Sequence, residues 1–115
     1  MDPSYRDAWF EQGRSLFALL QYDEAVVSFD KVLSLEPGHI GSSVQKGRSL
    51  FRLERFEEAI AAFDQALAGK PADPSAFYGK GRALAYVGRY REAIAQFDQA
   101  IAAYPDCYPA YFHKG

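Results

Sequence analysis

Cysteine, histidine, methionine and tryptophan are scarce in this chain, which holds one cysteine, two histidines, one methionine and one tryptophan among 115 residues. A single cysteine excludes an intrachain disulfide and is compatible with a reducing compartment. His39 and His113 share no metal-ligand spacing with a cysteine or carboxylate, so we expect neither a metal site nor a cofactor. No histidine is placed beside Cys107, which favours an inert thiol over a nucleophile.

Long apolar runs and a large net charge are also missing. No stretch approaches the roughly 18 apolar residues of a membrane span, and no signal peptide begins the chain. A cytoplasmic location fits these features best. The formal charge of −2 gives no general attraction for nucleic acid, and the hydrophobic content of 49% is typical of a globular chain. A chain of this length forms one domain.

The sequence contains an internal repeat, because the same residue types recur every 34 positions. Glycine, alanine, phenylalanine, proline, leucine and aspartate each form a ladder with this step: Gly13, Gly47, Gly81 and Gly115; Ala25, Ala59 and Ala93; Phe29, Phe63 and Phe97; Pro37, Pro71 and Pro105; Leu16, Leu50 and Leu84; Asp30, Asp64 and Asp98. Several ladders with one period of 20–50 residues indicate a solenoid or array, which offers an extended surface for partners.

Each repeat is predicted to contain two helical stretches. The first runs over about 6–19, 40–53 and 74–87, and the second over about 23–35, 57–69 and 91–103. Gly81 and Ala93 are small residues where two antiparallel helices must approach closely, and Phe97 fills the space beside them. Asp73 before Pro74 indicates an N-cap followed by proline at the first helical position. The prolines of the ladder end each second helix.

These residues resemble the tetratricopeptide repeat, a 34-residue helix–turn–helix unit with the pattern W-x2-L-G-x2-Y…A-x3-F…P. The first repeat matches at Trp9, Gly13, Leu16, Ala25, Phe29 and Pro37, and the third at Phe77, Gly81, Leu84, Ala93, Phe97 and Pro105. Tyr111 and Gly115 continue the pattern. Two features depart from it. The leucine before the glycine is replaced by Gln12, Lys46, Lys80 and Lys114, and Ser43 stands where an aromatic residue is usual. We therefore expect the start of that helix, near Gly41, to be the softest part of the array.

The resemblance implies an all-α fold, an α-solenoid of three antiparallel helix–turn–helix repeats in a right-handed superhelical array. The repeats cover about 6–39, 40–73 and 74–107, and the first helix of a truncated fourth covers 108–115. The chain opens on residues that close a repeat and stops halfway along a first helix. We therefore expect a segment of a longer protein with uncapped ends. The residues implied in repeat packing are Gly13, Ala25, Phe29, Gly47, Ala59, Phe63, Gly81, Ala93 and Phe97.

In this family the first helices line the inside of the superhelix, where ligands bind. The groove positions carried onto this chain are Phe10, Arg14, Phe17, Val44, Arg48, Phe51, Arg52, Tyr78, Arg82, Tyr86 and Phe112. Every full repeat thus places an arginine in the groove beside aromatic and aliphatic residues. Two interpretations remain open. The arginines bind carboxylates of a partner, or they pair with acids such as Asp7, Glu11 and the second-helix aspartates.

These features predict a protein–protein interaction module that binds a peptide or protein segment, acidic and with apolar anchors, in the groove. The alternative is a self-assembly element whose uncapped ends stack into oligomers, with Tyr90, Ile94, Phe97 and Ile101 exposed on the last second helix. The dicarboxylate clamp for chaperone C-termini needs lysines and asparagines in the groove. It is absent, because the aligned residues include Asp7, Glu11, Gly41, Gln45, Ser75 and Gly79.

Nucleic acid, membrane and enzymatic roles are disfavoured. The acidic balance and the lack of a lysine-rich stripe argue against RNA. The sequence Gly79-Lys80-Gly81 lacks the spacing of a phosphate-binding loop and falls inside a predicted helix. The aspartates of the ladder, one per repeat, indicate a solvated face or ion pairs between repeats rather than catalysis. We therefore expect no enzyme.

Overall fold

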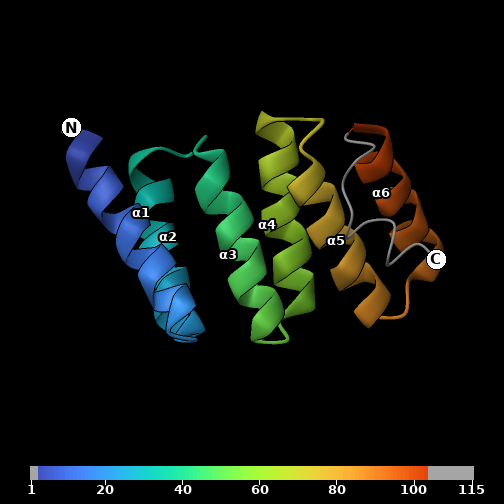
Figure 1. Cartoon of the computed structure of the whole chain (residues 1–115), viewed down its shortest axis with the longest axis horizontal. Helices are drawn as coiled ribbons and strands as arrows, with labels where there is room; N and C mark the ends of the chain where they lie inside the picture. The colour runs from blue at the N-terminus through green and yellow to red at the C-terminus, as the bar shows by residue number, and fades with distance from the viewer. Residues whose placement is uncertain (1–2, 104–115) are drawn as a thin grey trace.

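The computed structural model describes residues 3–103, and within this range it contains six α-helices and no strand. The helices are α1 (Pro3–Ala18), α2 (Tyr22–Leu35), α3 (Ile40–Arg52), α4 (Phe56–Gly69), α5 (Pro74–Tyr86) and α6 (Tyr90–Ala103). They follow one another in a row along the long axis of the molecule, joined by short connections (Figure 1). The predicted all-α repeat fold is confirmed. The predicted partial repeat 108–115 lies outside the described residues.

The helix boundaries agree with the predicted ones to within one residue, except at the start of α1. This helix begins at Pro3 instead of Arg6. Proline fits the first turn of a helix, because the N–H that it lacks would have no partner there. Arg6 lies inside α1 and forms ion pairs with Asp7 and with Glu36, which follows α2. No helix in 3–103 is both long and apolar enough to cross a membrane.

The two helices of each pair are joined by the same turn. One residue of the turn has a positive φ in all three pairs: Leu20 (65°), Glu54 (61°) and Gly88 (86°). The next backbone N–H donates to a carbonyl five residues back at 2.9 Å: Gln21 to Leu16, Arg55 to Leu50 and Arg89 to Leu84. This is the Schellman motif, which closes a helix with a residue in the left-handed region.

Within each pair, a phenylalanine ring of the second helix occupies the place where a glycine of the first helix has no side chain. These pairs are Gly13 with Phe29, Gly47 with Phe63 and Gly81 with Phe97, and a Cβ on each glycine would lie 2.7, 2.8 and 2.7 Å from the ring. All three rings are buried, as are Ala25, Ala59 and Ala93. The ladders of small and aromatic residues therefore meet inside each pair, and Ala59, Phe63, Ala93 and Phe97 belong to one core that joins the second and third pairs.

Contacts between pairs include two equivalent ion pairs. Lys46 Nζ lies 2.7 Å from Asp30 Oδ1, and Lys80 Nζ lies 2.7 Å from Asp64 Oδ1. The lysines that replace the family's leucine thus hold the aspartates of the preceding second helix. The prediction of ion pairs between repeats is confirmed for Asp30 and Asp64. Phe63 also contacts the next pair, because its ring fills the space beside Gly79 of α5.

Two side chains cap the starts of first helices. The Asp73 carboxylate accepts a hydrogen bond from the Ser75 backbone N–H at 2.9 Å, which confirms the predicted cap before Pro74. At α3 the cap is His39, whose Nδ1 accepts from the Ser42 N–H at 3.1 Å. His39 is thus a linker residue with a structural task. The softness of the start of α3 stays a prediction.

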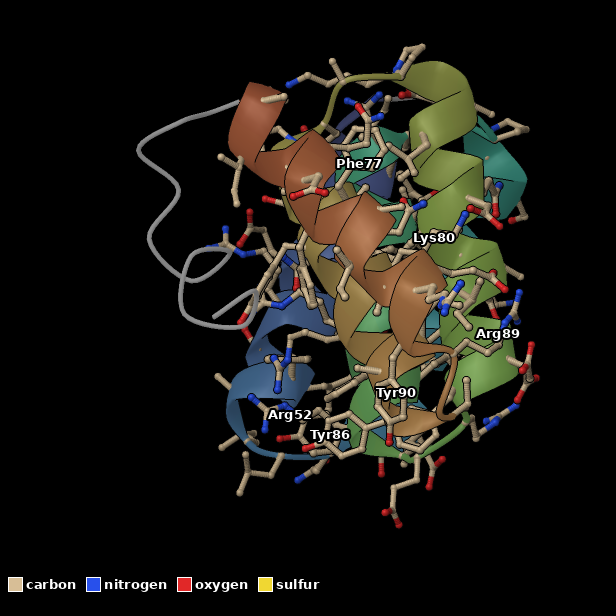
Figure 2. All side chains as sticks on the ribbon, turned by 90° about the vertical axis from the view of Figure 1, so that its right-hand side faces the viewer. Arg52, Phe77, Lys80, Tyr86, Arg89 and Tyr90 are labelled. Carbon is tan, nitrogen blue, oxygen red and sulfur yellow. The ribbon has the colours of Figure 1, made fainter. Side chains whose placement is uncertain are left out.

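The outer face of α6 differs from the predicted one. Phe97 was expected among its exposed residues, and this expectation is wrong, because only 3% of the residue is exposed. Its ring lies against Gly81 inside the last pair. Tyr90 and Ile94 are exposed as expected, and Ile101 is half-buried. Figure 2 shows Tyr90 at the end of the molecule, near the lower end of α6.

Candidate peptide-binding groove

The first helices α1, α3 and α5 form one side of the molecule. α3 contacts α1 and α5 directly, besides the second helices α2 and α4. Between α3 and α5 lies a pocket of about 300 Å3 that is lined by Val44, Gln45, Arg48, Phe51, Arg52, Phe63, Ser75, Tyr78, Gly79 and Arg82. A volume of this size is at the lower end for ligand-binding pockets. Six of the lining residues belong to the predicted groove set, namely Val44, Arg48, Phe51, Arg52, Tyr78 and Arg82.

Four lining residues were not predicted as site residues. Gln45, Ser75 and Gly79 lie at groove positions that were compared only with the chaperone clamp. Phe63 was assigned to repeat packing, because it belongs to a second helix. Its ring reaches the pocket because Gly79 has no side chain between them. Gly79 has no glycine counterpart one period earlier, where Gln45 stands, so no repeat pattern could have revealed this role.

Arg48 of α3 and Arg82 of α5 lie over aromatic rings of the preceding helix pair, and Arg82 also lies over a ring of its own helix. The Arg48 Cζ lies 5.2 Å from the centroid of the Phe17 ring. The Arg82 Cζ lies 4.6 Å from the Phe51 centroid and 5.6 Å from the Tyr78 centroid. Such contacts attract the cationic end of an arginine to the face of the aromatic ring.

Neither arginine forms an ion pair within residues 3–103. The aspartates that were considered as partners bind Lys46 and Lys80 instead. The Nε of Arg82 is buried and has no hydrogen-bond partner. A buried polar atom of this kind is rare in native proteins, and it leaves the charge of Arg82 incompletely compensated.

Arg14 behaves differently from the other two arginines of the ladder. It forms an exposed ion pair with Glu11 at 3.4 Å and lies 6.0 Å from the centroid of the Phe10 ring. It does not line the pocket. The three arginines of the ladder are therefore not equivalent, because only Arg48 and Arg82 line the pocket. The third arginine at the pocket is Arg52 of α3.

The remaining predicted groove residues lie outside the pocket. The Phe10 ring packs against Phe29 and the capping His39, with centroids 5.9 and 5.0 Å apart, so it contributes to the interior between the first two pairs. Phe17 packs edge-on against Tyr22. Tyr86 lies at the end of α5, where its ring stacks on Phe56 at 5.2 Å and meets Phe51 edge-on at 5.1 Å. Phe112 lies outside the described residues.

Among residues 3–103, the side chains with shifted pKa values lie at the turns and ends of helices and not at the pocket. Hydrogen bonds from Arg55 lower the pKa of the Glu58 carboxyl below its usual value, and Arg89 lowers the pKa of Glu92 in the same way. Within 3–103 no three histidine, cysteine or carboxylate side chains gather as metal ligands would. The pocket therefore offers cationic and aromatic side chains as its chemistry.

Comparison with known proteins defines the class. The profile of the family described as anaphase-promoting complex, cyclosome, subunit 3 matches residues 18–100, most of the chain. The chain belongs to this family of tetratricopeptide-repeat proteins. Proteins of this class are interaction modules that bind other proteins. No curated protein sequence matches the chain significantly.

Solved structures share the fold. The first tetratricopeptide domain of RPAP3, determined with the HSP90 peptide SRMEEVD, aligns with a TM-score of 0.94 and 21% identity over 99% of this chain and 90% of its own. The tetratricopeptide domain of Arabidopsis OM64 aligns with a TM-score of 0.93 and 20% identity over 96% of this chain and 92% of its own chain. YrrB, described as having an unusual peptide-binding site, aligns with a TM-score of 0.90 and 26% identity over 95% of this chain and 56% of its own chain.

Proposed function

We propose that the chain is a protein–protein interaction module whose groove, at the pocket between α3 and α5, binds an acidic peptide segment that carries an apolar anchor. The observation that supports this most strongly is the set of three arginines, Arg48, Arg52 and Arg82, at one pocket without an acidic lining residue. Carboxylates of a peptide would supply the missing negative charge, since guanidinium groups match carboxylates in geometry.

The apolar part of the pocket supports an anchor beside the acids. Phe51 and Tyr78 lie under Arg82, and Phe63 forms part of the lining through the gap at Gly79. Aromatic and arginine side chains in a partly desolvated pocket are typical of residues that dominate binding energy. The proposed ligand therefore carries an apolar side chain for this surface and acidic side chains for the arginines.

The RPAP3 domain was determined with an acidic peptide, but this chain lacks the lysines and asparagines of the chaperone clamp. Its aligned residues include the acids Asp7 and Glu11, which repel a carboxylate. We therefore propose recognition through the arginines between α3 and α5. Nucleic acid is disfavoured as a partner, because the net charge is −2 and the cations gather at one pocket instead of along a stripe.

The test compares three fluorescent peptide libraries with the full chain by anisotropy. Each library has a fixed central leucine, flanked by aspartate and glutamate, by lysine, or by serine and glycine. The proposal predicts binding of the acidic library only, and loss of that binding in Phe51→Ala as well as Arg82→Ala. Equal binding of the three libraries, or a preference for the lysine library, contradicts it.

A second candidate function is self-assembly through the outer face of α6. Val26 of α2 and Ile60 of α4 face the next pair and are only 9% and 8% exposed. Ile94, the equivalent residue of α6, is 47% exposed. Tyr90 continues this exposed surface. We propose that a second copy packs on this face at high concentration, as α3 packs on α2.

A further inference from the structure

We propose that the pocket between α3 and α5 is suited to a phosphorylated side chain within the bound peptide. This inference rests on the proposed function and names the group that the arginines recognise. It concerns the pocket alone, and the acidic flanking residues of the peptide keep the role given above.

The first argument is charge. Three cationic side chains, Arg48, Arg52 and Arg82, line the pocket, and no carboxylate lies among the lining residues. One peptide carboxylate carries a single negative charge and leaves most of this positive charge uncompensated. A phosphate monoester carries a charge of about −1.5 to −2 at pH 7 and therefore balances the pocket more closely.

The second argument is the number and direction of donors. The Arg82 guanidinium lies over the Phe51 and Tyr78 rings, and that of Arg48 lies over the Phe17 ring. Neither guanidinium forms an ion pair within residues 3–103, so the terminal N–H groups of both remain for a ligand. Paired donors from three arginines, with Arg52 included, exceed the roughly four lone-pair sites of one carboxylate. The three oxygens of a phosphoryl group can accept from all of them in paired hydrogen bonds.

The third argument is the way in which Arg82 is held. Its Nε is buried without a hydrogen-bond partner, and its ring contacts fix the side chain before any ligand arrives. Ordering a long side chain in advance reduces the entropy lost on binding. A dianion in the adjacent pocket would offset the uncompensated charge more strongly than a monoanion.

A peptide is favoured over a nucleic acid as the carrier of the phosphate. The cations surround one pocket of about 300 Å3 that also contains Val44 and Phe63, so there is room for one phosphorylated side chain and its apolar neighbour. A nucleic acid would need further cations along its backbone. The acidic residues Asp7 and Glu11 lie on the neighbouring first helix instead.

The experiment measures binding of the full chain to three fluorescent libraries that differ only at a fixed central residue, which is phosphoserine, glutamate or serine, between leucine and aspartate. We expect the phosphoserine library to bind at least about tenfold more tightly than the glutamate library. Lowering the pH from 7.5 to 5 should weaken the phosphoserine library alone, since the second phosphate pKa is about 6 and that of glutamate about 4.3. The pocket lining contains no histidine or carboxylate that would titrate in this range.

Two variants make the test specific. Arg82→Lys keeps the charge but removes the paired donors, so we expect it to lose most of the preference for phosphoserine. Arg91→Ala removes a charge from the exposed surface of α6, outside the pocket, and should keep the preference. Equal affinity for the phosphoserine and glutamate libraries overturns the inference and leaves the proposed function standing. Failure of both libraries to bind overturns both. Tighter, Arg82-dependent binding of a single-stranded RNA oligomer would also overturn the inference.

Discussion

At the scale of single residues, the fold depends on places where a side chain is missing. Glycine inside a helix costs about 1 kcal/mol relative to alanine, yet Gly13, Gly47 and Gly81 all lie in helices. The ring of the paired phenylalanine explains them, because it occupies the position of the absent Cβ. The same substitution should therefore have opposite effects at helical glycines where a Cβ would clash with a ring and where it would make an ordinary contact.

We expect Gly47→Ala and Gly81→Ala to destabilise the chain by about 1–3 kcal/mol, because the added methyl group would displace a buried ring. Gly41→Ala is the matched control. It is also helical, but its Cβ would lie 3.4 Å from the nearest atom of the Phe10 ring, an ordinary contact. It should stabilise the chain by up to about 1 kcal/mol. Urea unfolding of the three variants measures this, and stability gains in all three would refute the ring contact.

The sequence predicted that the glycine ladder marks close packing, and the pairing of glycine with phenylalanine followed from its period. It could not predict the role of Gly79, because Gln45 stands one period earlier. Glu11 was among the acids considered as partners of the arginines, but the repeat pattern did not show that Arg14 alone would pair with it. The lysines that interrupt the family pattern were noted only as departures, although Lys46 and Lys80 link consecutive pairs.

At the scale of helices and turns, one turn geometry is used three times with three different residues. Leu20, Glu54 and Gly88 all have a positive φ. For a residue with a Cβ, the left-handed region costs about 1–2 kcal/mol. The turns after α1 and α3 are therefore strained relative to the turn after α5. The helix boundaries were predictable from periodicity, but the shared turn conformation was not, because only one of the three residues is glycine.

Glu54→Gly should stabilise the chain by about 0.5–1 kcal/mol, and Gly88→Ala should destabilise it by about 1 kcal/mol. Gly38→Ala is the control outside the helices. Its Cβ would meet nothing within 4 Å, and its φ is not positive, so it should be neutral or slightly stabilising. Thermal unfolding monitored by circular dichroism compares the three variants. A Gly88→Ala variant as stable as the parent would show that the turn adapts without strain.

At the scale of the whole molecule, the structure is a row in which each helix pair contacts only the neighbouring pairs (Figure 1). Each second helix thus carries a face for the next pair, and α6 exposes Ile94 and Tyr90 there. The sequence predicted this face from the repeat period, but it misplaced Phe97, because periodicity alone does not tell which side of a helix a ring occupies.

Self-association should depend on this face. We expect Ile94→Asp to reduce or abolish dimer formation at high micromolar concentration, because a charge there would be desolvated in the contact. Gln99→Asp, an exposed substitution on the same helix that introduces the same charge, is the control. Sedimentation velocity over a concentration series reads out both. A parent chain that is monomeric throughout rules out this mode of assembly.

The central claim is that the arginines between α3 and α5 bind a partner. The most direct measurement is a titration of the acidic, leucine-centred peptide library with the parent chain, Arg48→Ala, Arg82→Ala and the control Arg91→Ala at two salt concentrations. We predict that Arg82→Ala weakens binding by about 2 kcal/mol or more, that Arg91→Ala changes it little, and that salt weakens binding to the parent more than to Arg82→Ala. Unchanged affinity in both pocket variants at both salt concentrations would contradict the claim and assign these arginines to the scaffold.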